Sequence, residues 1–256
     1  MTGLPIRYVQ CDISDPEMAR LLPEKVDVII HCAAVISYAP FSSVLLDVNC
    51  KGLQNIAEYA NASGCRQFVF FSSIPIIGRP KYLPIDEAHP INPPTVYHLT
   101  KAFGESFLSI ALKKECCLCV FRIPSPIGPR TPHGKIVPTL INNALEGKDI
   151  VLLGRGGRVQ NYIDIDDIAE AVALVLEKPV AGLFNIASGK SYSNLVLARK
   201  CIDLFDSQSR IIFSGEDPDE NVMWEISTAK AKEAFGFSAK TTLEESLLRM
   251  AEYYQR

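Results

Sequence analysis

The chain has 256 residues, enough for one or two domains with a sizeable core, and 26 basic against 29 acidic side chains leave a net charge of −3. Because nucleic acid and anionic membranes attract clustered Lys and Arg, this weak acidity argues against both as partners. The most apolar stretch, residues 26–36, is far shorter than the ~20 residues that span a bilayer and contains Asp27 and His31.

The expected strands and helices alternate along the chain. Short apolar runs predict strands at residues 6–9, 26–31, 67–71, 118–123 and 182–186. Stretches with a helical period predict helices at residues 44–62, 96–113, 138–146, 166–177 and 194–205. This order is typical of an α/β fold in which a doubly wound parallel sheet is covered on both faces.

The eight cysteines are expected to stay reduced, because no apolar leader with a cleavage site precedes them. We therefore expect a cytoplasmic protein. Alternation along a strand would place Cys117 and Cys119 on the same side as Phe121, which favours packing over metal binding. The four histidines share no metal-ligand spacing, so no metal site is predicted.

The composition changes after residue 123. Residues 123–134 contain four prolines and two glycines, which indicates a loop, and a second turn cluster follows at residues 154–157. We expect a sheet domain formed by residues 1–124 and 158–187. A smaller, discontinuous α/β region for substrate binding is expected from residues 125–157 and 188–256.

Three side chains point to a reaction site. Tyr97 and Lys101 are four residues apart on the helix expected at residues 96–113, so both project from one face. They are expected to lie beside a buried apolar stripe formed by Val96, Leu99, Phe103, Phe107 and Ile110. Ser72 and Ser73 follow the strand expected at residues 67–71, at the sheet edge where ligands bind in open α/β folds. A solvated Tyr and Lys and a turn-capping Ser are the alternative interpretation, but together the three groups favour a site for one carbonyl or carbinol.

Nine segments, in order, resemble the NAD-dependent epimerase/dehydratase family of the extended short-chain dehydrogenase/reductase superfamily. They are QCDISD, VDVIIHCAAV, DVNCKGLQN, FVFFSSIPIIG, YHLTKAFGE, FRIPSPIGP, NYIDIDDIAEAV, GLFNIASGKSYS and STAKAKEAFGF. The resemblance implies a Rossmann-type sheet domain, NAD or NADP as cofactor and hydride transfer on a nucleotide sugar. In keeping with the weak net charge, we expect no nucleic-acid or membrane partner, and a homodimer is the assembly considered.

The resemblance also implies roles for individual residues. Tyr97 would be the general acid/base, Lys101 would lower its pKa and hold the nicotinamide ribose, and Ser73 would hydrogen-bond the reacting oxygen. The cofactor would further contact Asp12, Ile13, Ala33, Ala34, Asn49, Ile123 and Pro126. The substrate would contact Ser73, Ser125, Arg158 and Gln160.

The sequence departs from the family pattern in three places. Only Gly3 precedes Gly52, so the strand, G-x-x-G-x-x-G turn, helix and strand that begin family members are missing before residue 6. The GRGGR run at residues 154–158 is not expected to replace that turn, because no strand-to-helix turn surrounds it. Ser125 stands in place of an Asn, and Gln160 stands in place of an Arg that contacts the nucleotide phosphates in the family. We therefore expect an N-terminally truncated Rossmann-type sheet that binds NAD weakly.

Two alternatives remain beside the nucleotide-sugar hypothesis. With Ser125 and Gln160 at these positions, the substrate need not carry a phosphate. This fits a dehydrogenase of the same superfamily that acts on a hydroxysteroid or another carbinol. The missing glycine-rich turn fits a cofactor-free remnant that is not an enzyme. The ligand that raises the melting temperature would discriminate among the three.

Overall fold

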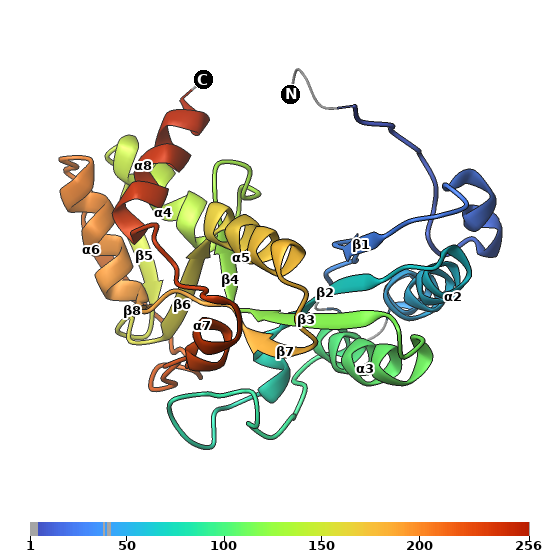
Figure 1. Cartoon of the computed structure of the whole chain (residues 1–256). Helices are drawn as coiled ribbons and strands as arrows, with labels where there is room; N and C mark the ends of the chain where they lie inside the picture. Colours follow the sequence, from blue (N-terminus) through green and yellow to red (C-terminus); the bar gives the residue numbers. More distant parts are fainter. Residues whose placement is uncertain (1–4, 38, 40–41, 256) are drawn as a thin grey trace. The chain divides into compact units, whose positions relative to one another are not determined.

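The computed structural model describes residues 5–37, 39 and 42–255, and within them the chain forms two compact units (Figure 1). The first comprises the described chain up to Ile76, Ile91–Phe121 and Pro179–Leu183. The second comprises Ile77–Pro90, Arg122–Lys178 and the described chain from Phe184 onward. This division differs from the expected domain boundaries, chiefly at residues 77–90 and 158–178, and the assignment of a cofactor domain and a substrate region stays a prediction.

The first unit is built around a sheet in which the strand order is β1-β2-β3-β7, with β1 and β2 parallel. Its strands are β1 (Val28–His31), β2 (Gln67–Ser73), β3 (Cys117–Ile123) and β7 (Gly182–Asn185), the last two of which continue into the second unit. Its helices are η1 (Pro16–Leu21), α1 (Ser43–Leu46), η2 (Asp47–Gly52), α2 (Leu53–Ser63), η3 (Ile74–Ile77, whose last residue belongs to the second unit) and α3 (Val96–Ala111).

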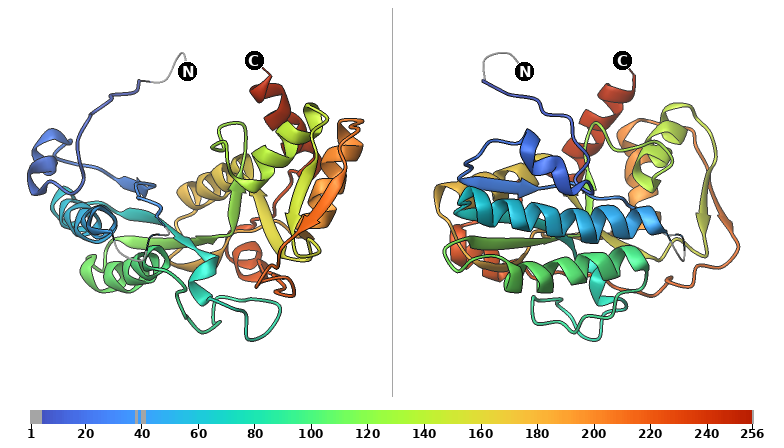
Figure 2. Two further views of the ribbon diagram at one scale, coloured as in Figure 1. Left: turned by 180° about the vertical axis from the view of Figure 1, so that it is seen from behind. Right: turned by 90° about the vertical axis from the view of Figure 1, so that its right-hand side faces the viewer.

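A single apolar core joins the sheet of the first unit to its helices. Phe68 and Phe70 of β2 pack with Leu53 and Ile56 of α2 and Leu108 of α3. Figure 2 shows α2 and α3 side by side along the sheet. The predicted helix at residues 44–62 is present as the continuous series α1, η2 and α2, in which η2 is a π-helical turn.

The close contact of α3 with β2 depends on a glycine. A Cβ atom on Gly104 would lie 2.5 Å from Cζ of Phe70 and 3.0 Å from Cδ2 of Leu53. No side chain fits at such distances without displacing its neighbours. The absence of a side chain at Gly104 therefore sets how near the helix lies to the strand.

The predicted burial of the apolar stripe on α3 is wrong for three of its five residues, although Phe107 does pack against the core. Leu99 is 56% exposed and Ile110 84% exposed, and Phe103 also faces solvent. The buried face carries His98, Thr100, Lys101, Gly104, Glu105 and Leu108 instead. The helix turns its polar face inward because that face meets the polar carboxyl end of β2 as well as the apolar core.

The predicted strand at residues 6–9 is also wrong. Residues 5–10 have no regular secondary structure, and Ile6 is 63% exposed. A strand is stable only when its backbone pairs with a neighbour, and no described strand pairs with this segment.

The second unit combines two small sheets with a helical layer. Its strands are β4 (Ser125–Ile127), β5 (Ile150–Leu153), β6 (Val159–Asp164), β8 (Ser191–Ser193) and β9 (Ile211–Ser214). Their order is β4-β6-β8 in one sheet and β5-β9 in the other. The helices are α4 (Ile136–Leu145), α5 (Ile165–Glu177), α6 (Asn194–Leu204), α7 (Ala229–Phe235) and α8 (Leu243–Tyr254).

The core of the second unit lies among α4, α6, α8 and the strands β5 and β6. Ile141, Ile150, Leu197, Leu247 and Met250 are fully buried there. The helix α8 begins with a capping box in which Thr242 and Glu245 satisfy each other's backbone N–H groups. None of these five strands was among the expected ones. Four of them, β4, β5, β8 and β9, have only three or four residues, too few to show a period.

The observed architecture confirms the predicted α/β class with a parallel sheet of the Rossmann type. Among the described residues, no helix combines the length and apolar character needed to cross a bilayer. All eight cysteines carry free thiols.

Gly104→Ala should destabilise the protein by about 1–3 kcal/mol, although alanine favours a helix more than glycine does, because its methyl group would collide with Phe70. Gly189→Ala is the matched control, since a Cβ atom there meets no atom within 4 Å. Urea unfolding of the three proteins tests this. Equal midpoints for Gly104→Ala and the parent would contradict the close contact.

Candidate active site

Tyr97 and Lys101 lie together on the inner face of α3. The helix begins at Thr95, whose hydroxyl accepts a hydrogen bond from the backbone N–H of His98. Lys101 is 6% exposed, and its Nζ lies 6.0 Å from the centre of the Tyr97 ring. The predicted pair thus places an ammonium group beside the phenol-bearing ring.

The Lys101 ammonium is held at the carboxyl end of β2. Its Nζ donates a hydrogen bond of 2.8 Å to the carbonyl oxygen of Phe71 and lies 5.1 Å from the centre of the Phe70 ring. Burial lowers the pKa of Lys101 to about 8, against a smaller opposing effect of the Cys32 thiol. At pH 7 this lysine therefore still carries a positive charge.

Ser73 is the last residue of β2 and lies two positions after the carbonyl group that holds Lys101. It is buried, and its hydroxyl makes no hydrogen bond to any residue that the structure describes. The hydroxyl of Ser72, by contrast, donates to Oε1 of the buried Glu105 on α3, at 2.5 Å. Ser73 thus retains a donor and two acceptor sites for a ligand.

Asn49 links the loop after β1 to α3. From the π-helical turn η2, its side chain accepts a hydrogen bond from Val35 N (2.8 Å) and donates to Val35 O (2.9 Å). It also donates to Oγ1 of Thr100 (3.1 Å), whose hydroxyl in turn donates to the carbonyl oxygen of Tyr97. π-Helical turns are frequent at functional sites. Ala33 and Ala34 belong to the loop that Asn49 holds, and Ala33 is exposed.

Asp12 and Ile13 lie at the start of the first unit. The Asp12 carboxylate accepts hydrogen bonds from the backbone N–H and hydroxyl of Ser14, which lower its pKa. The Ile13 carbonyl accepts from the Asn55 side chain at 2.8 Å. The Ile13 side chain packs so closely on Gly52 that a Cβ atom there would lie 2.8 Å away. Ile13 is therefore fixed against the start of α2, directly after Asp12.

His31 was given no role from the sequence, yet it lies close to Lys101. In the sheet it pairs with Phe70, and its imidazole stacks on the Phe70 ring at 6.0 Å. Burial, with a smaller effect of the Lys101 charge, lowers the pKa of His31 to about 4. In the sequence, this position could have been recognised from a polar residue, His31, at the end of an otherwise apolar strand.

The other five predicted site residues belong to the second unit. Ile123 ends β3, Ser125 and Pro126 pair with Tyr162 and Ile163 of β6, and Gln160 pairs with Tyr192 of β8. Arg158 precedes β6 and forms an ion pair of 3.6 Å with Asp219. Its charge is therefore partly neutralised within the chain.

The glycine-rich turn at residues 154–157 already holds a carboxylate. It joins β5 to β6, and the backbone N–H groups of Arg155 and Gly157 donate to the two carboxylate oxygens of Glu220, at 2.9 and 2.8 Å. The turn joins two strands, and its backbone N–H groups are already bonded to Glu220. Both facts support the expectation that it does not hold a pyrophosphate. In the described part of the chain, no cluster of three or more His, Cys, Asp or Glu residues is arranged to hold a metal ion.

Comparison with known proteins identifies the family. Residues 2–187 match the NAD dependent epimerase/dehydratase family, and the chain belongs to it. A UDP-glucose 4-epimerase of Mycolicibacterium smegmatis is 27% identical over 262 residues, which cover 97% of this chain and 82% of that protein.

Two solved structures share the fold. The UDP-glucose 4-epimerase of Thermotoga maritima, solved with UDP-glucose, has a TM-score of 0.86 and 24% identity, covering 96% of this chain and 83% of that one. The dTDP-glucose 4,6-dehydratase of Streptomyces venezuelae, solved with NAD and TYD bound, has a TM-score of 0.83 and 24% identity, covering 97% and 79%.

The lowered pKa of His31 predicts a pH-dependent stability. Because its pKa is about 4 in the folded protein and about 6.5 when unfolded, the unfolded chain binds an extra proton once the pH falls below 6.5. Stability present above pH 6.5 is thus lost towards pH 4, by about 2–3 kcal/mol at pH 4.5. His31→Gln should lack this loss.

Urea unfolding at pH 7 and pH 4.5 measures the effect, with His133→Gln as an exposed control that keeps the full loss. If His31→Gln and the parent lost equal stability on acidification, the imidazole would not be held neutral by its surroundings.

Proposed function

We propose that this protein is an NAD(P)-dependent oxidoreductase of the epimerase or dehydratase type that acts on a nucleotide sugar. The observation that carries the proposal is the buried Lys101 ammonium, 6.0 Å from the Tyr97 ring and bonded to the end of β2. Tyr97 serves as general acid/base, Lys101 supports it, and Ser73 hydrogen-bonds the reacting oxygen.

The charge of Lys101 makes this role of Tyr97 feasible. A free tyrosine has a pKa near 10, so removing its proton near pH 7 costs roughly 4 kcal/mol. A positive charge close to the ring stabilises the phenolate and reduces that cost. The unpartnered hydroxyl of Ser73 can donate to the substrate oxygen while Tyr97 exchanges the proton.

Several residues of the first unit suit contacts with a nicotinamide dinucleotide. When bound, the cofactor supplies hydride transfer. Asp12 and Ile13 would contact the adenine, Ala33, Ala34 and Asn49 would line the dinucleotide, and Lys101 would hold the nicotinamide ribose. Ile123 and Pro126 stay predicted contacts of the cofactor. The exposed Asp12 carboxylate keeps lone pairs free for an amino group, which supports its part.

The relatives support a nucleotide sugar as substrate, since the solved epimerase carries UDP-glucose and the dehydratase is named for dTDP-glucose. Ser125, Arg158 and Gln160 would contact it. For Arg158 to bind a diphosphate it must exchange its partner Asp219 for the ligand.

One observation favours the second candidate, a carbinol or hydroxysteroid dehydrogenase. Gln160 is neutral and Arg158 is paired with Asp219, so neither offers a free positive charge to a diphosphate. Melting temperatures with UDP-glucose and with a hydroxysteroid discriminate the two, because only a bound ligand stabilises the fold. If the protein is a cofactor-free remnant, neither ligand should raise the melting temperature.

A cytoplasmic homodimer is the assembly we propose. The exposed side chains of Leu99, Phe103 and Ile110 form an apolar stripe along α3, of the kind that marks interaction surfaces.

Tyr97→Phe should reduce kcat by ~100-fold or more in any form of the protein that holds a nicotinamide cofactor, because it removes the proton carrier and keeps the ring. Epimerisation of UDP-glucose is the assay. Tyr253→Phe, at an exposed tyrosine of α8, should leave kcat unchanged. Comparable turnover in Tyr97→Phe and the parent would eliminate Tyr97 as the proton carrier.

The 256-residue chain should bind NAD only weakly, with a Kd of roughly 1 mM or more, equivalent to about −4 kcal/mol or weaker. Its residues include no glycine-rich turn from a strand into a helix to bind the pyrophosphate. Isothermal calorimetry on the folded chain measures this. Fusing a family strand-turn-helix-strand unit in front of residue 6 should bring the Kd to the micromolar range, whereas a micromolar Kd without it would refute the argument.

A further inference from the structure

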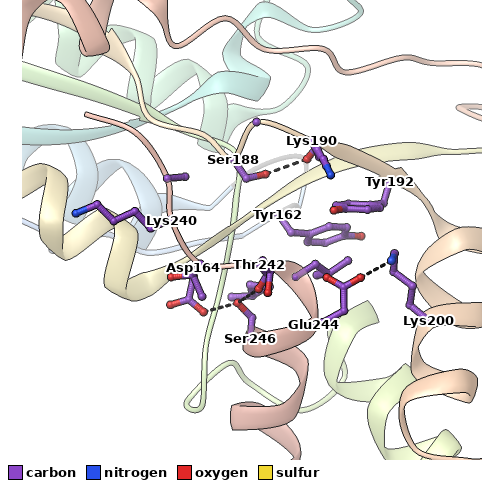
Figure 3. Close-up of a pocket in the computed structure, with 15 residues that line it drawn as sticks. Tyr162, Asp164, Ser188, Lys190, Tyr192, Lys200, Lys240, Thr242, Glu244 and Ser246 are labelled. Carbon is purple, nitrogen blue, oxygen red and sulfur yellow. Dashed lines mark hydrogen bonds and ion pairs between the residues drawn. The ribbon is translucent and has the colours of Figure 1, made fainter. Parts of the chain in front are cut away.

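The polar side chains around the cavity of the second unit bind one another. This cavity has a volume of about 380 Å³ and lies among β4, β6, β8, α6 and the start of α8 (Figure 3). Lys200 forms an ion pair with Glu244, and the hydroxyl of Ser246 donates to the carboxylate of Asp164. These contacts stabilise the second unit, whereas a more reactive pair of groups lies in the first.

Two cysteines of the first unit lie where the neighbouring strands β2 and β3 begin. Cys65 stands between Gly64, the C-cap of α2, and the start of β2, and Cys116 comes directly before β3. The backbone N–H of Cys117 donates to the carbonyl oxygen of Arg66 at 2.8 Å, which joins the two segments at this point. Adjacent strands are about 4.8 Å apart, within the Cα separation of roughly 4.4–6.8 Å that a disulfide bridges.

The two thiols are in direct contact. The side chains of Cys65 and Cys116 are hydrogen-bonded to each other, and both belong to the apolar core of the first unit. The Cys65 thiol donates to the carbonyl oxygen of Gln67 at 3.0 Å, so its sulfur accepts from Cys116. The backbone around the two cysteines thus holds their sulfur atoms next to each other.

This contact makes the two sulfur atoms chemically unequal. The hydrogen bond from Cys116 lowers the pKa of the Cys65 thiol, and backbone hydrogen bonds with Gln67 and Ile29 act in the same direction, against the effect of burial. The same bond, together with burial, raises the pKa of Cys116. Because the thiolate is the nucleophilic form of cysteine, Cys65 is the attacking sulfur and Cys116 the resolving one.

The pair lies close beneath the surface. Cys65 and Cys116 are 6% and 8% exposed, and their neighbours Gly64, Arg66 and Glu115 are exposed. Both cysteines belong to segments that connect a helix to a strand. Such segments open locally at a lower free-energy cost than the strands themselves, which gives a small oxidant access to the thiols.

We propose that Cys65 and Cys116 form a dithiol that a hydroperoxide oxidises to an intrachain disulfide. The Cys65 thiolate attacks a peroxide oxygen, the O–O bond breaks, and Cys65 becomes a sulfenic acid while the other oxygen leaves as water or an alcohol. The Cys116 sulfur then attacks the Cys65 sulfur, and the S–O bond breaks to release water. The two thiols thus lose two electrons and two protons, which the peroxide gains. The proposal does not depend on the proposed reaction.

Peptide mapping tests the proposal on the folded, reduced chain. Treatment with hydrogen peroxide at pH 7 is followed by N-ethylmaleimide, which blocks the remaining thiols, and by digestion with trypsin without reductant. Cleavage after Lys and Arg releases Cys65 in residues 52–66 and Cys116 in residues 115–122. We expect these two peptides to be linked, and dithiothreitol to separate them. Absence of the link, or a link from Cys65 to a cysteine outside residues 115–122, would overturn the proposal.

Variants identify the second sulfur atom, because residues 115–122 also contain Cys117 and Cys119. Cys117→Ser is the matched control, one residue from Cys116, and should form the link at the rate of the parent. Cys116→Ser and Cys116→Ala should both lose the link and accumulate a sulfenic acid on Cys65, which dimedone traps. A link that survives in both would refute the pairing.

Fragmentation of the linked peptide from Cys117→Ser keeps the test decisive if the Cys116 variants do not fold, since neither sulfur atom of the pair is changed. It should place the bridge at Cys116, and a bridge at Cys119 would refute the assignment.

The fold should direct this pairing. In urea the same treatment should lose its preference for the link between residues 52–66 and 115–122, because the unfolded chain no longer holds the two thiols together. An equal yield of the link in the native and the unfolded protein would contradict a dithiol formed by the fold.

Discussion

The close packing of α3 on β2 is the constraint on which the first unit depends. Because Gly104 has no side chain, the helix backbone comes near enough to Phe70 for Lys101, almost one turn earlier, to reach the Phe71 carbonyl. Burying an ammonium group is costly, and that hydrogen bond together with the rings of Phe70 and Tyr97 offsets the cost. The same contact leaves Leu99, Phe103 and Ile110 of the apolar stripe exposed.

The longer elements of the fold could be predicted from the sequence because their periods are regular, whereas the five strands of the second unit could not. The helix expected at residues 194–205 is α6, Asn194–Leu204, and the strand expected at residues 118–123 is β3, Cys117–Ile123. The orientation of α3 could not be predicted from its apolar stripe, since such a stripe meets either the protein's own core or a partner. Gly104, on the same face as Tyr97 and Lys101, was the better indicator of the buried side.

The residues of the candidate site could be predicted from motifs, but their partners could not. The spacing of Tyr97 and Lys101 follows from helix geometry alone. The contacts of Lys101 with Phe71, of Asn49 with Val35, and of Arg158 with Asp219 join segments far apart in the sequence. Such pairs form only when the chain folds, so no local sequence pattern predicts them. The stacking of His31 on Phe70 could not be predicted for the same reason.

The hydrogen bonds already made decide what each group can still offer a ligand. Asn49 uses both amide hydrogens on Val35 and Thr100 and one oxygen lone pair on Val35 N, so its main contribution is to position the loop after β1 against α3. Lys101 has three donors, of which the Phe71 carbonyl takes one. Two donors therefore remain. One could contact a ribose hydroxyl and the other the oxygen of Tyr97. In the function proposed above, a single lysine fixed by one backbone carbonyl would thus serve both cofactor binding and proton transfer.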